Sequence, residues 1–455
     1  MDGKEVAPPS EGEADDLAVR EAAYETFVWD NLKRNYLGNY LHGMLGMTGF
    51  RLVNAPTFLP AYLHAVSGSN AVVGLALALQ QVGGIISPIF GATKVEHRKI
   101  VMPAAILMGS LGRLAILGMA LAGWFVTAER QTLSVPFTDW QFTVQPQVAV
   151  LLFFITMFGV FMGAQRVVFS LLMSKVIPIS RRGRLQAWRN VTGGAIAAVL
   201  AWVAGKYFIG PNLFGNGYST TFLFAFVLTS LGLWALQLLL KEPEPPTTRA
   251  QSKFIARLKE FPTLIREDRA YGFFVLVQML ATSARIATPF YILHVGKEVG
   301  TDGATLGLLS FAFLGADTAS NLVWGYMGDK IGFRSVLLVS IIGWIGATLV
   351  LMNVHEPWAI FAAFAGLGAS LSGYMMGAQT MILEFGDRDD LPMRIAVSAT
   401  AESITATLGP LIGGVVAEIY GYNVVFGASV GFLVAALIVL VLLVSEPRRT
   451  RVGRV

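Results

Sequence analysis

Long apolar segments follow one another along most of this chain, separated by short polar stretches. A helix needs about 20 apolar residues to cross a hydrocarbon core of about 30 Å. Soluble domains carry charge on about a quarter of their residues, whereas only 14% of these 455 residues are charged. The sequence therefore predicts an all-α membrane protein and excludes an ordinary water-soluble enzyme.

Twelve segments are long enough to span a membrane, and a charged linker divides them into two groups of six. The expected spans are 36–62, 71–92, 100–127, 148–176, 186–207, 220–240, 270–293, 304–326, 335–353, 359–384, 395–418 and 424–445. The predicted domains are a bundle at 36–240, a linker at 241–269 and a bundle at 270–445, with tails at 1–35 and 446–455. In the first tail, 16–34 fits either an amphipathic helix at the membrane interface or a solvated segment.

The basic residues indicate which side of the membrane each loop occupies. One set of short loops holds most of them, including Lys94, Arg98, Lys99, Arg181, Arg182, Arg184, Lys330, Arg334, Arg388 and Arg394. The opposite loops hold little beyond Arg130, Lys206 and Lys297. Since basic residues stay on the cytoplasmic side, we expect both termini in the cytoplasm and the protein in the cytoplasmic (inner) membrane. The excess of basic over acidic residues then reflects topology and not nucleic-acid binding.

The two halves of the chain carry the same residue types at matching positions. The matching pairs are Arg51 with Arg285, Gly74 with Gly307, Gly91 with Gly325, and Gln165 with Gln379. The first three pairs keep the same separation to within one residue, so the register holds through two spans and a loop. Parallel repeats of this kind, with a site between them near the midplane, are a known transporter plan.

The loop between spans eight and nine carries the most specific motif. It reads Gly325-Tyr-Met-Gly328-Asp329-Lys330-Ile-Gly332-Phe-Arg334. Small residues permit close helix crossing, and Gly332 permits a tight turn. The loop closely resembles the G-x-x-x-D-[RK]-x-G-[RK]-[RK] signature of the major facilitator superfamily. This resemblance implies two pseudo-symmetric six-helix bundles that rock about a central site, exposing it to each side in turn.

The resemblance also implies a gate at the cytoplasmic ends of the spans. Its expected members are Gly325, Asp329, Lys330, Gly332 and Arg334, with Glu384 at the end of span ten and Arg394 in the loop that follows. In the family scheme, Asp329 would engage the cytoplasmic end of span five near Arg184 or Trp188. That contact would hold the outward-open state. The first-half loop departs from the signature, because Val95 stands at the aspartate position.

Arg51 and Arg285 stand near the middle of spans one and seven. A charge at that depth costs from about 2.5 kcal/mol upward, so it should face a cavity or a partner. Arginine suits bidentate binding of carboxylate or phosphate oxygens, and a symmetric pair resembles the organic-anion branches of the family. The two arginines are therefore either substrate ligands, or partners of Asp317, Glu402 or backbone carbonyls freed by nearby prolines.

Asp317 and Glu402 are the candidates for proton coupling, because a carboxylate in a low-dielectric cavity can take up a proton near neutral pH. The alternatives are that Asp317 neutralises Arg285 and that Glu402 makes a hydrogen bond between helices. Arg166 in span four would extend a basic path inward. Arg113 in span three is expected to have a structural partner.

Uncharged polar residues within the spans could also bind a polar substrate. The candidates are Asn54, Gln81, Gln165, Gln278, Tyr291 and Gln379. Asn54 and Gln278 lie three and seven residues from an arginine, which places them on the same helix face. For each candidate, a hydrogen bond that joins two helices is the alternative.

The chain has no cysteine, five scattered histidines and no phosphate-binding loop motif. We therefore expect no metal, no cofactor and no enzymatic activity. The leading hypothesis is a monomeric secondary transporter in the lipid bilayer that moves a small polar solute, such as an organic anion, with protons. The alternatives are an uncoupled facilitator, a multidrug-type efflux pump, and a receptor or assembly protein on the same scaffold.

Overall fold

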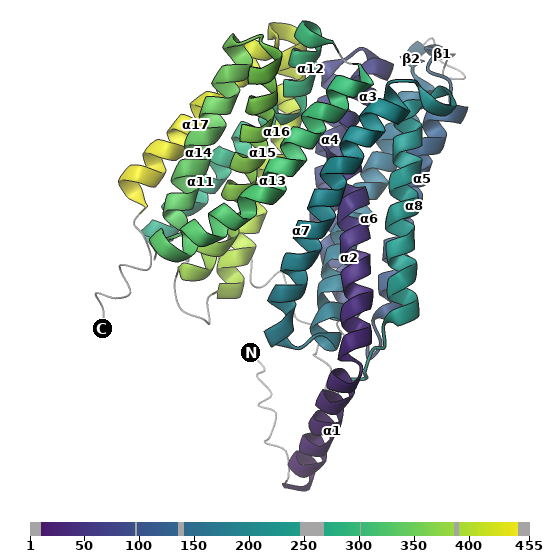
Figure 1. Ribbon diagram of the computed structural model, residues 1–455, viewed down its shortest axis with the longest axis vertical. Helices are drawn as coiled ribbons and strands as arrows, with labels where there is room; N and C mark the ends of the chain where they lie inside the picture. The colour runs from purple at the N-terminus through teal and green to yellow at the C-terminus, as the bar shows by residue number, and fades with distance from the viewer. Residues whose placement is uncertain are drawn as a thin grey trace.

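The computed structural model describes residues 11–95, 98–134, 141–245, 268–300, 302–385 and 391–444. The chain forms two bundles of long helices that lie next to each other, with the first half on the right of Figure 1 and the second half on the left. Most of the predicted linker, at 246–267, and the whole of the predicted tail at 446–455 lie outside the described residues. The predicted domain boundaries stay predictions.

The first bundle contains the helices up to α8. Its helices are α1 (Glu11–Asp30), α2 (Leu32–Asn54), α3 (Phe58–Ser67), α4 (Asn70–Val95), α5 (Met102–Phe125), α6 (Pro146–Val176), α7 (Ile179–Val203) and α8 (Gly217–Leu239). A π-helical turn η1 (Ala204–Ile209) continues α7, and a 3₁₀ turn η2 (Leu213–Gly215) precedes α8. The first tail contains α1, which projects from one end of the bundle (Figure 1); this end is called the α1 end below.

The second bundle repeats the arrangement. Its helices are α11 (Arg269–Ala284), α12 (Thr288–Val299), α13 (Gly303–Ile331), α14 (Phe333–Asn353), α15 (Pro357–Met381), α16 (Leu391–Tyr420) and α17 (Tyr422–Leu443), with 3₁₀ turns η3 (Arg285–Ala287) and η4 (Ile382–Glu384). Within the described residues, ten helices are long and apolar enough to cross a membrane. Together with α2–α3 and α4, which pack beside them in the first bundle, they confirm the predicted all-helical membrane fold.

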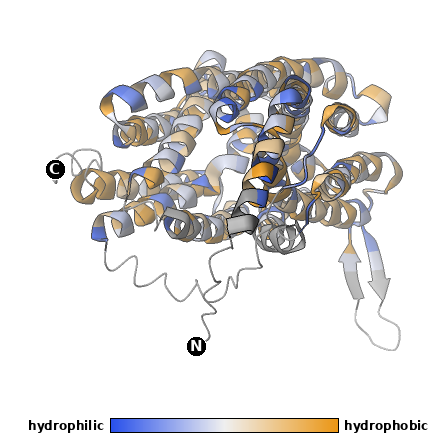
Figure 2. Cartoon of the chain, turned by 90° about the horizontal axis from the view of Figure 1, so that it is seen from below, coloured by the Kyte–Doolittle hydropathy of each residue, from blue (hydrophilic) through white to orange (hydrophobic). Residues whose placement is uncertain are grey.

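One element was not expected from the sequence. The loop after α5 folds into an antiparallel hairpin of β1 (Gln131–Ser134) and β2 (Gln141–Val144), in which Gln131 pairs with Val144. Seen from the α1 end, the helices are hydrophobic along much of their length and the hairpin stands outside the bundles (Figure 2). The end of the molecule opposite α1 is called the hairpin end below.

The first membrane helix of each bundle breaks at the position of the predicted arginine repeat. Arg51 lies in the last turn of α2, and Ala55 before Pro56 has an extended backbone (ψ 134°). In the second bundle, Arg285 begins η3, and Thr288, the residue before Pro289, begins α12 with a helical backbone (φ −52°, ψ −47°). Proline disfavours a helical conformation at the residue before it, as at Ala55, and its missing N–H leaves a carbonyl of the preceding turn without its helical donor. The break after Arg51 and the 3₁₀ turn at Arg285 therefore both follow from local sequence.

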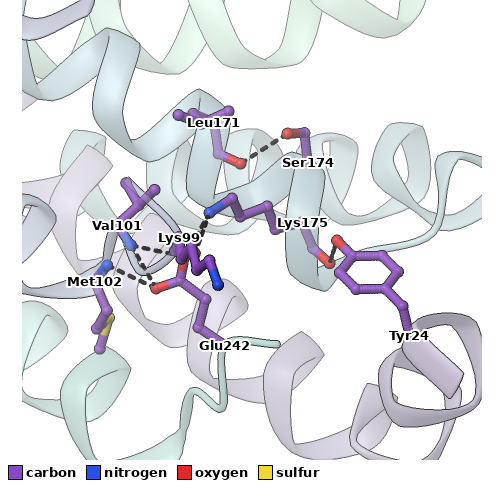
Figure 3. Close-up of polar contacts among 8 residues, drawn as sticks. All are labelled: Tyr24, Lys99, Val101, Met102, Leu171, Ser174, Lys175 and Glu242. Atoms are coloured by element: carbon purple, nitrogen blue, oxygen red, sulfur yellow. Dashed lines mark hydrogen bonds and ion pairs between the residues drawn. The ribbon is translucent and has the colours of Figure 1, made fainter. Parts of the chain in front are cut away.

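Buried polar contacts fasten the α1 end of the first bundle (Figure 3). The Glu242 carboxylate, which follows α8, accepts hydrogen bonds from the N–H groups of Val101 and Met102 at the start of α5, at 2.7–2.9 Å. Lys175 at the end of α6 pairs with Glu242 at 3.0 Å. Its carbonyl accepts a hydrogen bond from the Tyr24 hydroxyl of α1 at 2.9 Å. An anion at a helix N-terminus is favourable, so Glu242 ties three membrane helices together.

Two seams join the bundles, and both lie between the middle of the helices and the hairpin end. The α4–α16 seam brings Gly74 against Pro410 and Gly414. The α7–α13 seam brings Gly205 of η1 against Gly303 and Gly307. Glycines at such crossings let two backbones approach closely. Toward the α1 end the bundles diverge in Figure 1, so the structure is closed at the hairpin end.

Candidate functional site

A cavity of about 430 Å³ lies between the bundles, on the α1 side of the α4–α16 seam. Its walls come from both bundles. They include Asn54, Pro56, Leu59, Leu77, Gln80, Gln81, Phe158, Met162, Arg166, Arg285, Thr288, Pro289, Ser403, Ala406 and Pro410. Of the described residues that line it, none belongs to α7 or α13. The cavity is therefore enclosed by the broken helices α2–α3 and α11–α12 together with α4, α6 and α16.

Two arginines from opposite bundles line this cavity. Arg166 projects from α6 of the first bundle and is exposed although it lies deep in the bundle. Arg285 stands at the break between α11 and α12 of the second bundle. The internal repeat predicted Arg51 as the counterpart of Arg285. The structure instead gives Arg166 the place opposite Arg285.

Arg51 is engaged in an ion pair across the α7–α13 seam. Its Nη1 lies 2.6 Å from Oδ2 of Asp317 and 3.0 Å from Oγ1 of Thr318, both on α13 of the other bundle. About a fifth of each charged side chain is exposed. Among the two alternatives for Arg51, this geometry favours pairing with a carboxylate. The expectation that Asp317 neutralises Arg285 is wrong, because α13 faces α2 and α7 and does not line the cavity.

Glu402 lies on α16 next to the cavity-lining Ser403. Its Oε1 is 3.4 Å from the hydroxyl of Tyr374 on α15, so it does take part in a contact between helices. The same hydroxyl lies 3.4 Å from Oγ1 of Thr282 and donates to the carbonyl of Gln278 at 3.2 Å. Glu402 therefore lies next to the second-bundle wall of the cavity, which includes Arg285 and Ser403.

Amide groups complete the polar part of the cavity. The Asn54 side chain donates to the Phe50 carbonyl at 2.9 Å and accepts from the Gln80 amide at 2.7 Å. Asn54 is exposed to the cavity, as predicted for a residue one turn from Arg51. Gln81, which the sequence predicted as a polar ligand, lines the cavity, whereas its neighbour Gln80 was not predicted. Two consecutive glutamines in an apolar span are a usable signal.

The other uncharged candidates lie away from the cavity. Tyr291 is buried inside the second bundle, where its hydroxyl contacts Thr348 at 2.8 Å and its ring packs on Phe426. Gln278 and Gln165 are also buried within their bundles, and Gln379 is exposed on α15 outside the cavity lining. Helical spacing predicted which face of its helix each residue occupies. The packing of the helices then decided whether that face borders the cavity.

Arg113 has the structural partners that the sequence predicted. Its guanidinium donates to the carbonyls of Thr229 and Gly109 at 2.7 and 2.6 Å, and it lies above the Phe50 ring. Only 2% of the residue is exposed. The two carbonyl groups accept the hydrogen bonds of the guanidinium without a carboxylate. Because Thr229 lies on α8, Arg113 links α5 to α8.

The predicted gate residues lie at the α1 ends of α13 to α16. Gly332 has a positive φ (93°) and turns the chain from α13 into α14. Lys330 lies over the Tyr326 ring at 4.4 Å, and a side chain at Gly325 would meet open space. Asp329 is exposed in the last turn of α13. Its predicted contact with Arg184 or Trp188 belongs to the state in which this end is closed, and it stays a prediction.

The remaining gate candidates make contacts within the second bundle. Arg334 donates to the carbonyls of Leu440 and Val441 at 3.2 and 3.0 Å, which caps the end of α17. Arg394 pairs with Asp268 at 2.6 Å and so joins α16 to the start of α11. Glu384 is half-buried in η4. In this conformation, Arg334 and Arg394 therefore hold helices of one bundle together and do not bridge the two bundles.

No group of three or more histidine, aspartate or glutamate side chains within the described ranges is placed to hold a metal ion. The cavity chemistry is that of two guanidinium groups, one carboxylate nearby, and amide and hydroxyl groups. Such groups can bind and orient a polar solute, but they do not form a nucleophile with an adjacent base.

The chain is similar in sequence to a family model and to several multidrug resistance proteins. Residues 272–454 match the family model described as Major Facilitator Superfamily. Multidrug resistance protein MdtG from Escherichia fergusonii is 29% identical over 167 residues, which are 35% of this chain and 40% of that protein. The MdtG protein from Yersinia enterocolitica is 31% identical over 156 residues, or 33% of this chain and 37% of that protein. The chain thus covers about two fifths of these relatives.

Solved structures share the fold over nearly the whole chain. A crystal structure of a point mutant of the nucleoside transporter NupG superposes with a TM-score of 0.69 at 12% identity, covering 90% of this chain and all of that one. A D-xylose-proton symporter superposes with a TM-score of 0.62 at 15% identity, covering 93% and 99%. The family model covers the second bundle and agrees with the signature in the loop between α13 and α14, and the solved structures share the two-bundle fold.

Proposed function

We propose that this protein is a secondary transporter that moves a small anionic solute by alternating access and couples that movement to protons. The observation that carries the proposal is the placement of Arg166 and Arg285, from opposite bundles, in the walls of one cavity. A solute held by both would link the bundles directly. Closure around it would then depend on the solute, as alternating access requires.

We propose that the protein lies in the inner membrane and that its α1 end faces the cytoplasm. Exposed basic residues gather there, among them Arg98, Lys99, Arg181 and Arg184, and basic loops stay on the cytoplasmic side. The α1 end also carries α1 itself and the ends of α8 and α17 (Figure 1), which supports the proposal that both termini lie inside the cell. Because the seams close the hairpin end, the structure represents the inward-facing state.

The charge of the cavity favours an anion. Arg166 and Arg285 line the cavity, and Glu402, next to the cavity-lining Ser403, offsets part of that charge. Guanidinium groups bind carboxylate or phosphate oxygens with two parallel hydrogen bonds. The amides of Asn54 and Gln80 can then bind hydroxyl or carbonyl groups of the same solute. The predicted substrate is therefore a small carboxylate or phosphate ester with further polar groups.

Asp317 and Glu402 are the proposed proton carriers. Asp317 pairs with Arg51 across the α7–α13 seam at 2.6 Å, so a proton on Asp317 would weaken a contact between the bundles. Glu402 precedes the cavity-lining Ser403 on α16, so a proton on Glu402 would change the charge that a substrate meets. Proton uptake would thereby act on both the seam and the substrate site.

A multidrug-type efflux function is the second candidate. The relatives with sequence similarity are named multidrug resistance proteins, and Leu59, Leu77, Phe158 and Met162 give the cavity an apolar wall. This function predicts that lipophilic compounds bind and that the cavity arginines contribute little. The two functions therefore differ in the effect of removing a guanidinium.

The deciding experiment measures binding and transport with arginine variants. Purified protein is screened by thermal stabilisation against small carboxylates, phosphate esters, neutral analogues and lipophilic cations. Hits are repeated with Arg166→Gln and Arg285→Gln, and with Arg130→Gln as a matched control on an exposed loop outside the cavity. A hydrogen bond to a charged group contributes about 1.5–3 kcal/mol, so each cavity variant should weaken anion binding on the order of tenfold or more.

Transport of the hits into proteoliposomes, with and without an imposed pH gradient, tests the coupling. Uptake that depends on the gradient supports a proton-coupled transporter, and uptake that ignores it supports a facilitator. Binding without any uptake supports the receptor hypothesis. Stabilisation by neutral or lipophilic compounds alone, unchanged in both arginine variants, would overturn the anion proposal.

A further inference from the structure

A second hollow lies at the α1 end, between α2 and α7 and separate from the central cavity. It has a volume of about 540 Å³ and is lined by Leu32, Lys33, Tyr36, Leu37, Tyr40, Arg181, Arg184 and Trp188. The two helices pack against each other along this side of the first bundle. This hollow is called the α2–α7 groove below. It lies at the first turns of both helices, the level at which lipid headgroups meet water.

The basic side chains of the groove have no acidic partner among the described residues. Lys33, Arg181 and Arg184 are exposed, and none of them belongs to an ion pair among the described residues. The lining contains no acidic side chain. The groove therefore presents three positive charges to whatever occupies it.

Not every arginine in this part of the chain faces the groove. Arg182 turns away from the groove and caps α6, with hydrogen bonds to the carbonyls of Ile177 and Ser174 at 2.8 and 2.6 Å. Arg181 and Arg184 are three residues apart, so they share a helix face, and Trp188 follows one turn later on the same face. Of the three arginines in the Arg181-Arg182-Gly183-Arg184 segment, one is therefore structural and two face the groove.

The rest of the groove is apolar and aromatic. Leu37 is 48% exposed and Trp188 is 55% exposed, although both are large hydrophobic residues. Tyr36 and Tyr40 are half-buried, and the Tyr40 hydroxyl lies 3.3 Å from Oγ1 of Thr192. Tryptophan and tyrosine favour the depth at which acyl chains meet headgroups. The groove thus offers cations for a headgroup and an apolar wall for a chain.

We propose that the α2–α7 groove binds an anionic phospholipid of the cytoplasmic leaflet. Arg181, Arg184 and Lys33 hold the phosphate and headgroup, and the acyl chain lies along Leu37 and Trp188. A soluble anion such as inorganic phosphate would leave the apolar wall uncovered, whereas a neutral lipid would leave three cations without a counter-ion. An anionic lipid satisfies both parts of the groove, because its charge and its chains are joined in one molecule.

Trp188 provides a direct optical test. The protein is reconstituted in phosphatidylcholine vesicles that contain an increasing fraction of brominated phosphatidylglycerol or, in parallel, brominated phosphatidylcholine. The Trp188 signal is the difference in fluorescence between the wild type and Trp188→Phe. Each basic residue near an anionic lipid contributes about fivefold in affinity, so phosphatidylglycerol should quench Trp188 at a mole fraction about tenfold or more below that of phosphatidylcholine.

Matched variants separate the groove from the general charge of this end. Arg181→Gln/Arg184→Gln should remove the preference for phosphatidylglycerol. Arg98→Gln/Lys99→Gln, which removes the same charge from the same end but outside the groove, should keep it. Equal quenching by both lipids, equal effects of the two double variants, or displacement by inorganic phosphate would each overturn the proposal. The measurement needs no substrate, so its outcome does not depend on the proposed transport function.

Discussion

The two seams between the bundles are built on the same plan but differ in where they place charge. In both, glycines let helices cross closely: Gly74 meets Gly414 in the α4–α16 seam, and its repeat partner Gly307 meets Gly205 in the α7–α13 seam. The α7–α13 seam adds the ion pair of Arg51 and Asp317 near mid-membrane. The α4–α16 seam has its carboxylate at the hairpin rim, where Glu418 accepts from the Asn70 N–H at 2.6 Å.

This difference assigns separate tasks to the two sides of the molecule. Below its glycine crossing, the α4–α16 seam opens into the cavity, so Gln80, Gln81 and Ser403 are available to a solute. The α7–α13 seam stays closed at the same depth, because Asp317 holds Arg51 there. One seam thus opens into the proposed substrate site, and the other holds the charge pair that we propose a proton weakens.

The largest expected effect comes from breaking the mid-membrane ion pair. Asp317→Asn leaves Arg51 without its carboxylate, and removing one partner of a buried pair costs about 3–5 kcal/mol. The one-fifth exposure of both side chains lowers that cost. We expect proton-driven transport to fall on the order of 100-fold, equivalent to about 2.7 kcal/mol, measured as initial uptake in proteoliposomes.

The matched control is Glu418→Gln, which removes one carboxylate from the other seam. Thermal unfolding of Arg51→Gln/Asp317→Asn is a second control, because removing both charges should restore stability without restoring proton coupling. If Glu418→Gln reduced transport as much as Asp317→Asn, the two seams would not differ in the way proposed here.

An intermediate effect is expected from the glycine crossings. A Cβ at Gly74 would clash with the Pro410 carbonyl oxygen and lie 3.0 Å from the Gly414 Cα, and a Cβ at Gly307 would lie 2.9 Å from the Trp202 carbonyl oxygen. Overpacking of this kind costs about 1–3 kcal/mol. Gly74→Ala and Gly307→Ala should therefore open the hairpin end on the order of tenfold more often, and to a similar degree in both seams.

The absence of cysteine from the chain makes this opening easy to measure. Ala406→Cys places a single thiol in the cavity wall, and a membrane-impermeant maleimide added at the hairpin side reports its accessibility. Gly346→Ala serves as the control, because a side chain there meets open space. Faster labelling in only one of the two seam variants would show that the seams do not open together.

The smallest effect is expected at the hairpin rim. Glu418 is exposed, and a carboxylate at a helix N-terminus contributes about 0.3–1 kcal/mol. Glu418→Gln keeps an acceptor for the Asn70 N–H but removes the charge. Labelling of the Ala406→Cys reporter from the hairpin side should rise about two- to fivefold, and high salt should reduce the difference. A rise as large as that of Gly74→Ala would show that the carboxylate, and not the glycine crossing, holds this seam closed.

Local signals in the sequence account for most of the fold. The apolar segments gave the spans, and Pro56 and Pro289 gave the helix breaks beside Arg51 and Arg285. The internal repeat gave the pairing of Gly74 with Gly307, which occupy corresponding crossings. The β1–β2 hairpin was missed, although every second residue at 133–137 and at 140–144 is a large apolar one, with Thr138 and Asp139 between the two runs. Such alternation around a short polar stretch is a usable hairpin signal.

The sequence alone also determined that the charges within the spans must have partners or face a cavity, since lipid solvates neither cations nor anions. Only the tertiary structure decided which charge took which role: Arg51 pairs with Asp317, while Arg166 joins Arg285 at the cavity. The physical reason is that helical periodicity fixes the angle between residues on one helix. The direction in which each face of that helix points is set by packing against helices that are distant in the sequence. Because these helices are apolar on nearly all sides, their sequences do not show which face meets which neighbour.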